Sequence, residues 1–531
     1  MMAPVRPAQP ARPMQTPIAN PARPGRSLSA LAVAAAVDKP RPVGGGLPPA
    51  PAAAAPRRLP IDMDLPGADS PLHFGLKLRA KWRGLRRGLA IAVVLVVTLG
   101  SLVVSQGYLK LHQVFRGGTA TAAALKGNVN PDLLKGEGSG RVNILLMGRG
   151  GGNHDGPDLT DSMMLVSVDP VNHTSTLLSL PRDLWVNVPN SGVMKLNAAW
   201  ETGEFQYLGK TAPGSTNPKA ITAGFNLVDQ TVQQILGVDV DYNVLVDFQA
   251  FQQAVDTVGG VSVNVPTPLV DPTMAWQNNH NPTLAPAGLD NFNGNQALLY
   301  VRSRETSSDF ARADRQRAVL VALKNKVETV GTLSNPFKIS GLMNSFGNNV
   351  QTDLSLGNAE RLYGIVKKIQ GSNISSVDLD GGTSSAAAQL VSDGNVNGQA
   401  VVLPKAGLFQ YGDIQQFVRG QLKDPYILKE HAKVLVLNGT QTPGLATNMA
   451  SELQSYGYNV VGTGNTPAND WLRTSLFELN SKDKYTNHYL EQRLNVTASR
   501  NLGDKSIQTN GADFVIIIGS DEASSTSTPQ N

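Results

Sequence analysis

Cysteine is absent from the 531-residue chain, so disulfide scaffolds and thiolate metal sites are excluded. Histidine is scarce as well: the seven histidines show no metal-ligand spacing, and only His154, inside a glycine-rich stretch, lies near other candidate site residues. That stretch, 148–164, contains no Gly-Lys-Ser/Thr, which excludes a P-loop nucleotide site. The chemistry of the chain must therefore come from other side chains.

The basic charge of the chain is confined to its N-terminal part. Residues 1–87 carry 14 basic and 4 acidic side chains, a net charge of +10, whereas the rest carries a net charge of −5. Residues 1–75 hold 16 of the 34 prolines and few aromatics, which predicts a disordered tail. Attraction of residues 77–87 to anionic membrane lipid explains the charge, and we expect no specific nucleic-acid partner.

An uncharged run follows this basic flank and predicts one transmembrane helix. Residues 89–105 contain 17 residues without a charge, and extension to Tyr108 gives about 20, the length of a membrane span. A cleaved signal peptide and a buried helix are the alternatives. The depth in the chain, the lack of a small-residue cleavage site and the one-sided basic flank favour a signal anchor within 76–108. The positive-inside rule then places the N-terminus in the cytoplasm and the later residues outside it.

Hydrophobic periodicity after the membrane segment predicts two α/β domains. A stalk is expected at 109–138. Residues 139–425 alternate buried-strand runs, such as 142–147 and 163–168, with helical patterns, such as 221–236. Residues 430–521 form a second, smaller α/β pattern, and 522–531 a disordered end.

Five arginines lie close together in the stretch 302–317. Arg302 and Arg304 alternate on what we interpret as a strand, which sends both side chains to one face. Asp309 is a suitable helix N-cap, and Arg312, Arg315 and Arg317 follow it. Guanidinium groups suit phosphate and pyrophosphate oxygens, so the cluster predicts a shared anionic ligand. The alternative is a set of surface ion pairs with Glu305, Asp309 and Asp314.

Other polar residues follow predicted strands upstream. Asp155, Asp158 and Asp161 are spaced by three in the glycine-rich stretch and predict oxygen ligands for Mg²⁺, with a solvated acidic turn as the alternative. Three further polar candidates follow in the sequence: Arg182 in LPRDLWV, and Lys195 and Asn197 in KLNAAW.

These pieces, in this order, resemble the LytR-CpsA-Psr family. The matching segments are NILLMG, LTDSMMLVSVDP, LSLPRDLWV, KLNAAW, VDFQAFQQAVDTVGGVSVNVP and YVRSRETSSDFARADRQ. They cover 142 to about 330, with looser similarity to about 425, and residues 432–521 resemble the small LytR C-terminal domain. The resemblance implies a layered α-β-α catalytic domain and a small α/β C-terminal domain.

The resemblance also implies a function. Members of this family are membrane-anchored, extracytoplasmic phosphotransferases that move a glycopolymer from a polyprenyl-pyrophosphate carrier to peptidoglycan, which leaves a phosphodiester link. Carried across, Asp161 matches the Mg²⁺ ligand, and Asp309 matches an acidic residue that acts as a base or as a supporting partner. The pyrophosphate-binding set is matched by Arg182, Arg302, Arg304, Arg312 and Gln316, and we add Lys195, Asn197 and Arg315 as further substrate-binding residues.

One departure from the family pattern concerns the metal. Many members carry a second metal-binding aspartate in a G-x-D pattern, where this chain has Gly148-Arg149-Gly150. Asp155, Asp158 or water would then replace that ligand. The alternative function is a non-catalytic protein that binds polyprenyl phosphate or wall glycan, or an attenuator-like regulator.

Overall fold

The computed structural model describes residues 122–126, 129–152, 154–303, 309–329, 347, 349–379, 389–503 and 506–521. The predicted tail, the predicted membrane helix and the first part of the predicted stalk lie outside these residues. Within the described ranges, no helix combines the length and the apolar character that crossing a membrane requires.

A six-stranded mixed sheet is the centre of the first domain, with the strand order β11-β6-β1-β2-β3-β12. Its strands are β1 (Val142–Arg149), β2 (Thr160–Asp169), β3 (Thr174–Leu180), β6 (Tyr242–Asp247), β11 (Val350–Thr352) and β12 (Ile374–Asp378). β1 is antiparallel to β2 and parallel to β6. The central strands are apolar along most of their length because both faces of the sheet are covered.

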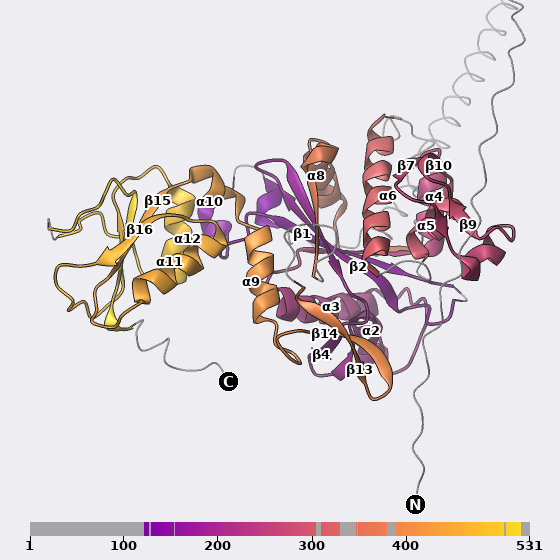
Figure 1. Cartoon of the computed structure of the whole chain (residues 1–531), viewed down its shortest axis with the longest axis horizontal. Helices are drawn as coiled ribbons and strands as arrows, with labels where there is room; N and C mark the ends of the chain where they lie inside the picture. Colours follow the sequence, from indigo (N-terminus) through magenta and orange to yellow (C-terminus); the bar gives the residue numbers. More distant parts are fainter. Residues whose placement is uncertain are drawn as a thin grey trace, which may run out of the picture. The chain divides into compact units, whose positions relative to one another are not determined.

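Helices cover the two faces (Figure 1). On one face, Trp200, Phe225 and Ile414 pack against Leu145 and Leu165 of the sheet. They come from α2 (Ala199–Leu208), α3 (Pro218–Leu236) and α9 (Gly412–Gln421). The opposite face is covered by η1 (Ala123–Lys126) and α8 (Leu356–Val366). The predicted α-β-α layering is confirmed.

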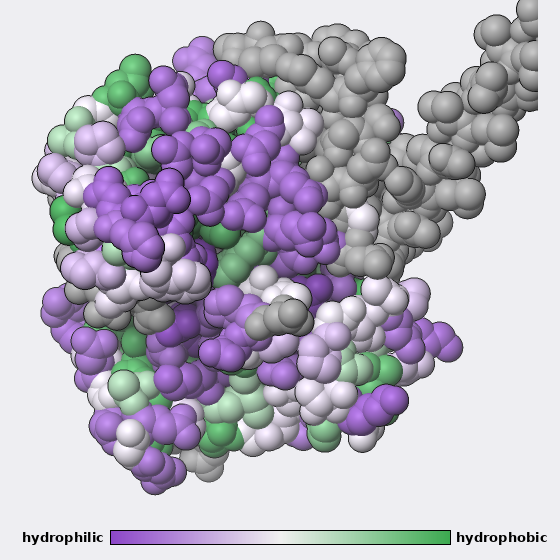
Figure 2. All heavy atoms as spheres, turned by 90° about the vertical axis from the view of Figure 1, so that its right-hand side faces the viewer, coloured by the Kyte–Doolittle hydropathy of each residue, from purple (hydrophilic) through white to green (hydrophobic). Residues whose placement is uncertain are grey.

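Three helices form a lobe with a core of its own, in which Val255, Val263, Phe292 and Leu299 are buried. Its elements are α4 (Phe248–Thr257), β7 (Val261–Val265), β8 (Leu269–Val270), η4 (Pro272–Gln277), β9 (Thr283–Ala285), β10 (Gly288–Phe292), α5 (Gly294–Arg302) and α6 (Asp309–Thr329). On the face of the molecule in Figure 2, hydrophilic side chains cover most of the described surface, and apolar ones show in small separate areas.

The prediction that Arg302 lies on a strand is wrong, because Arg302 is the last residue of helix α5. The helix is started by a capping box: the Asn293 side chain accepts from the Gln296 N–H, and the Gln296 side chain accepts from the Asn293 N–H. Five consecutive buried residues, 297–301, then favour the helix over an alternating strand because they pack all round it. The predicted helix after Asp309 is confirmed as α6.

Two hairpins complete the first domain. One hairpin consists of β4 (Trp185–Val188) and β5 (Gly192–Lys195), and the other of β13 (Val391–Val396) and β14 (Gln399–Pro404). The first domain also contains two short 3₁₀ helices, η3 (Leu196–Ala198) and η6 (Gly371–Asn373). The first hairpin matters for the site. It returns the chain so that the N–H of Asn197 donates to the carbonyl of Arg182 at 3.0 Å.

The C-terminal domain has a four-stranded sheet in the order β16-β15-β18-β17. Its elements are η2 (Pro131–Leu133), α10 (Pro425–Glu430), β15 (Lys433–Asn438), α11 (Leu445–Tyr456), β16 (Asn459–Asn465), β17 (Ser475–Glu478), α12 (Lys484–Leu494) and β18 (Phe514–Ile518). Its core includes Leu453, Tyr489 and Phe514, together with Val129 and Leu134 from the described part of the predicted stalk. The predicted second α/β pattern is thus a folded domain.

Candidate functional site

The candidate site forms where β1 and β2 separate. The pairing of the two strands shifts register between Gly148 and Arg149, and the glycine-rich loop follows. Asp161 is the second residue of β2, and its side chain is 27% exposed. Its Oδ1 accepts hydrogen bonds from Nη1 of Arg182 and from Nδ2 of Asn197, the latter at 3.3 Å. Asp161 therefore faces cationic and amide donors from a different segment of the chain.

Arg182 lies just after β3 and bridges two carboxylates. Besides Asp161, its Nε donates to Oδ2 of Asp183 at 3.2 Å, and Nζ of Lys195 donates to Oδ1 of Asp183 at 2.7 Å. Burial acts to lower the pKa of Arg182, but Asp161 and Asp183 outweigh it and raise the pKa. The four side chains form an alternating row of acidic and basic groups, in which Arg182 lies between two carboxylates.

Asn197 connects this row to the sheet. Its side chain is 6% exposed, and its carbonyl accepts from Oγ1 of Thr160 at 3.1 Å. The adjacent Thr160 and Asp161 of β2 thus bind the backbone and the side chain of the same residue. This arrangement fixes the KLNAAW segment beside Asp161.

Arg302, at the end of α5, reaches the same site from the helical lobe. Its guanidinium carbon lies 4.4 Å from the centre of the Phe248 ring. Nη1 donates to Oε1 of Gln277 at 3.2 Å, and Nη2 lies 3.5 Å from Nε2 of His154. Burial lowers the pKa of Arg302, and the negative charge of Asp161 opposes this shift. Arg302 and Asp161 therefore act on each other electrostatically.

Gln316, on α6, is placed beside β2. Oγ of Ser162 donates to Oε1 of Gln316 at 3.0 Å, and Nε2 of Gln316 donates to the carbonyl of Val301 at 3.4 Å. Because Ser162 follows Asp161 directly, this bond brings α6 next to the candidate site.

The remaining arginines of the cluster do not share one position. Arg315 is buried, and its Nε donates to the carbonyl of Tyr300 at 2.8 Å while Nη2 donates to the carbonyl of Ser303. These bonds satisfy backbone groups at the end of α5, which makes Arg315 a positioning residue for Arg302. Arg312 is also buried, and Arg317 pairs with Asp314 at 2.9 Å. The predicted residue Arg304 lies outside the described residues, and of Asp309 only its backbone position, the first residue of α6, is described.

With this geometry in place, comparison with known proteins identifies the family. A model described as the LytR_cpsA_psr family matches residues 109–401. The chain belongs to this family. A second model, described as LytR cell envelope-related transcriptional attenuator, matches residues 431–521, the folded C-terminal domain.

Curated members of the LytR_cpsA_psr family show the same similarity. A polyisoprenyl-teichoic acid–peptidoglycan teichoic acid transferase, TagU of Oceanobacillus iheyensis, is 29% identical over 316 residues, which cover 57% of this chain and 87% of that protein. The cell wall biosynthesis protein LcpA of Corynebacterium glutamicum is 28% identical over 328 residues, covering 58% of this chain and 60% of LcpA. The crystal structure of B. subtilis TagT matches with 22% identity and a TM-score of 0.40, covering 58% of this chain and 99% of TagT.

The three aspartates predicted to share a cation are not brought together in this LytR_cpsA_psr protein. Asp158 is buried and accepts from Nη1 of Arg149 at 2.8 Å and from the N–H of Gly214 at 3.0 Å, whereas Asp155 is exposed. Over the described ranges, no group of three or more His, Asp or Glu side chains is arranged to hold a metal ion. Asp161 is the one predicted ligand that lies beside the arginines.

His154 lies against Gly150, the position at which the family resemblance implies the aspartate of a G-x-D pattern. A Cβ added to Gly150 would meet Cγ of His154 at 2.6 Å, so the imidazole ring lies directly against this glycine. The same ring makes an edge contact with Phe248, with 5.3 Å between ring centres. A histidine of the same glycine-rich stretch thus contacts Gly150 on one side and lies near Arg302 on the other.

Sequence reasoning missed Phe248, Gln277 and Ser162. Phe248 had a readable signal: β6 is parallel to β1 and pairs Asp247 with Arg149, so the residue after β6 emerges at the same sheet edge as the glycine-rich loop. Ser162 is adjacent to Asp161 and so was a candidate by position. Gln277 lies in a 3₁₀ turn far along the chain and had no signal in the sequence.

Proposed function

We propose that the chain is a phosphotransferase that moves a glycopolymer from a polyprenyl-pyrophosphate carrier to peptidoglycan in cell wall assembly. The observation that supports this most directly is the convergence of Arg182 and Arg302 on Asp161 from two different parts of the first domain. The similarity to TagU, a polyisoprenyl-teichoic acid–peptidoglycan teichoic acid transferase, supports the same reaction class.

In this proposal the arginines bind the pyrophosphate. Guanidinium forks bind phosphate oxygens in pairs, and phosphoryl transfer depends on positioned charge rather than on a covalent nucleophile. Arg182 and Arg302 are already held in place by Asp183 and by Phe248, so little reorganisation is needed when the substrate arrives. The remaining members of the proposed substrate-binding set are Lys195, Asn197, Arg304, Arg312 and Gln316.

The proposed step is an in-line displacement. A hydroxyl oxygen of a wall sugar attacks the phosphorus that carries the glycopolymer, and the bond from that phosphorus to the bridging oxygen breaks. The polyprenyl phosphate leaves with the electron pair, and the arginines neutralise its developing charge. We propose Asp309 as the group that takes the proton of the hydroxyl.

The proposed cofactor is Mg²⁺. Proteins often bind Mg²⁺ through one or two carboxylates, with substrate phosphates and water as the other ligands. A single aspartate, Asp161, beside pyrophosphate-binding arginines fits this requirement. When bound there, the cation would supply Lewis-acid stabilisation of phosphate charge.

We further propose that residues 89–108 anchor the chain in the cell membrane, with residues 1–87 in the cytoplasm and the catalytic domain outside. The proposed partners are then membrane lipid, the carrier-linked glycopolymer and peptidoglycan. The relatives named as cell wall proteins support this side of the membrane.

The test uses the full-length chain in detergent with a polyprenyl-pyrophosphate-linked oligosaccharide, wall fragments and Mg²⁺. We expect release of polyprenyl phosphate and joining of the sugar to the wall, with at least about a hundredfold loss in Arg182→Ala and Arg302→Ala. Arg317→Ala is the matched control, because this arginine pairs with Asp314 on α6. Binding of the donor without release in all conditions would instead favour the non-catalytic binding or attenuator-like function.

A further inference from the structure

A pocket lies on α2, lined by residues that the proposed reaction does not use. Its volume is about 160 Å³. This exceeds the roughly 10–15 Å³ needed by one water and is below the roughly 300 Å³ of sites for drug-sized ligands. The size suits one ring-sized ligand.

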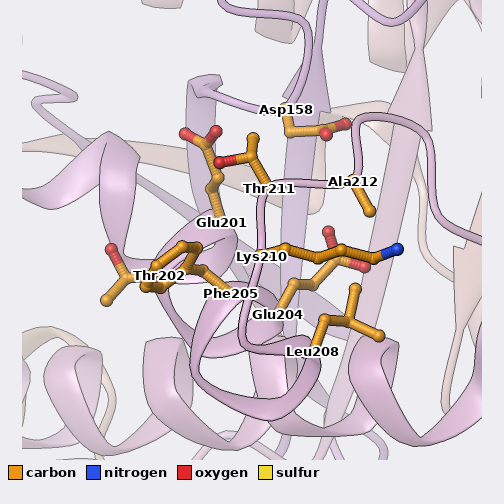
Figure 3. A pocket seen from close by; sticks show the side chains of 9 residues that line it. All are labelled: Asp158, Glu201, Thr202, Glu204, Phe205, Leu208, Lys210, Thr211 and Ala212. Atoms are coloured by element: carbon orange, nitrogen blue, oxygen red, sulfur yellow. The ribbon is translucent and has the colours of Figure 1, made fainter.

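One face of α2 supplies most of the pocket wall. Glu201, Glu204, Phe205 and Leu208 recur at intervals of three and four residues, so they share a helix face. Helix α2 ends at Leu208, the next residue, Gly209, is left-handed with φ 66°, and residues 210–212 line the same pocket. Figure 3 shows the carboxyl groups of Glu201 and Glu204 rising from α2 toward the loop that carries Asp158.

One oxygen of the Glu204 carboxyl group is buried without a hydrogen-bond partner among the described residues. The Glu204 side chain is 4% exposed and lines the pocket, and the unpaired oxygen is Oε1. Leaving a buried polar group unpaired costs about 1–3 kcal/mol. A ligand in the pocket that exchanges a hydrogen bond with Glu204 would remove this cost.

The charges around the pocket nearly cancel. Asp158 is neutralised by Arg149, with 2.8 Å between Nη1 and Oδ1. Burial raises the pKa of Glu204 to about 8, with Asp158 adding to the shift and Arg149 opposing it, so Glu204 is mainly a neutral acid near pH 7. One further acid and one base line the pocket, Glu201 and Lys210, and burial, with Asp158 adding to it, raises the pKa of Glu201. A pocket without net charge favours a neutral ligand over a cation.

The donors and acceptors match hydroxyl groups. A neutral carboxylic acid such as Glu204 offers one O–H donor, and every carboxyl group offers acceptor oxygens, so Glu204 and Glu201 together present both kinds of group. Sugar hydroxyls donate and accept at once, so neighbouring hydroxyls satisfy both groups. Phe205 is 48% exposed at the pocket and offers an apolar face to a ring.

We propose that the pocket on α2 binds one sugar ring of an uncharged glycan segment, with Glu201 and Glu204 contacting its hydroxyls and Phe205 contacting its apolar face. Assignment of this ring to the peptidoglycan acceptor rests on the proposed function. The binding itself does not, because it requires neither the donor nor turnover.

The test titrates the full-length chain with a soluble tetrasaccharide of N-acetylglucosamine, without donor, and measures binding by calorimetry. We expect Phe205→Ala to weaken binding about tenfold. Tyr207→Ala, an equally exposed aromatic on α2 that does not line the pocket, should leave it unchanged. Equal effects of the two variants, or no binding at millimolar saccharide by a folded chain, would overturn the proposal.

Two substitutions of Glu204 separate a sugar site from a cation site. Glu204→Gln keeps a neutral donor of the same shape and should retain binding within about twofold, whereas Glu204→Ala should lose about tenfold. Glu360→Ala, on the exposed surface of α8, is the control. If ethylammonium or Mg²⁺ binds instead and Glu204→Gln abolishes that binding, the pocket is a cation site and the proposal is wrong. Saccharide binding without turnover would support the sugar site and contradict the transferase proposal. Turnover without saccharide binding would support the transferase proposal and contradict the sugar site.

Discussion

Removal of one partner of the Arg149–Asp158 ion pair should destabilise the first domain strongly. Nη1 and Oδ1 are 2.8 Å apart, and both side chains are only 3% exposed. An unpaired charge at such a depth typically costs about 3–5 kcal/mol. In Arg149→Met, Asp158 keeps the N–H of Gly214 at 3.0 Å, while the apolar chain of Met still packs near the Trp200 ring. We therefore expect Arg149→Met to lower the free energy of unfolding by about 3 kcal/mol, near the lower end of this range.

A second ion pair in the same domain provides a matched control. Arg317 and Asp314 have almost the same separation, 2.9 Å, but both side chains are 33% exposed. Water and salt screen such pairs, and their contribution is about 0–1 kcal/mol. Arg317→Met should therefore cost no more than about 1 kcal/mol.

The measurement is amide hydrogen exchange of β1 and β2, because a chain with two domains need not unfold as a single unit. Arg149→Met should raise exchange in these strands far more than Arg317→Met. The double variant Arg149→Met/Asp158→Asn removes both charges and should recover part of the loss. Equal effects of Arg149→Met and Arg317→Met, or a double variant as unstable as the sum of its single variants, would refute the reasoning from burial.

Three further predictions concern the site and its support. Phe248→Leu removes the aromatic face under Arg302, worth up to about 2 kcal/mol, and should slow release of polyprenyl phosphate by about tenfold in protein that is shown to be folded; an unchanged rate would contradict this role. Gly150→Ala should displace the ring of His154 and reduce the same rate, and the added variant His154→Ala should restore space for the methyl group; no recovery in the double variant would count against the steric argument. Burial raises the pKa of Asp229 to about 7, so the folded state holds this proton more tightly than the unfolded state, and the group's contribution to stability falls as pH rises from about 4 to about 7. Asp229→Asn should therefore raise the free energy of unfolding at pH 8, by at most about 4 kcal/mol, and have little effect at pH 4; a gain of the same size at both pH values would show that titration is not the cause.

The secondary structure of the sheet could be predicted from the sequence because its central strands are continuous apolar runs. Residues 142–147 and 163–168 are strands, as their composition predicts, and Asp309 begins a helix as predicted. The segment that carries Arg302 could not be read in the same way. Arg302 and Arg304 alternate like strand residues, but the capping box at Asn293 and the buried run 297–301 select a helix.

The sequence correctly indicated that arginines gather near the candidate site, but it did not predict how their side chains are arranged. A strand followed by a helix was expected to direct five guanidiniums at one anion. On α6, Arg312, Arg315 and Gln316 are separated by three and four residues and share a face, whereas Arg317 turns toward Asp314. Arg315 binds the carbonyls of Tyr300 and Ser303. The end of a helix leaves carbonyl groups unpaired, and a pattern of charges alone does not show that an arginine will be used to satisfy them.

The pairing of Asp158 shows why spacing alone overestimates a metal site. Aspartates at intervals of three in a loop suggest a shared cation, but a loop rich in glycine follows no helix period that would align them. Arg149, the last residue of β1, is a buried cation that pairs with Asp158 inside the protein, whereas Asp161 faces Arg182. Arg149, which pairs with this candidate ligand, directly precedes Gly150, the residue that stands where the family resemblance implies the aspartate of a G-x-D pattern. In the proposed reaction, Mg²⁺ is held by Asp161 and by the substrate's own phosphates. Asp161→Asn should therefore reduce Mg²⁺-dependent release far more than Asp155→Asn; equal losses in the two variants would mean that the exposed loop aspartate shares the cation after all.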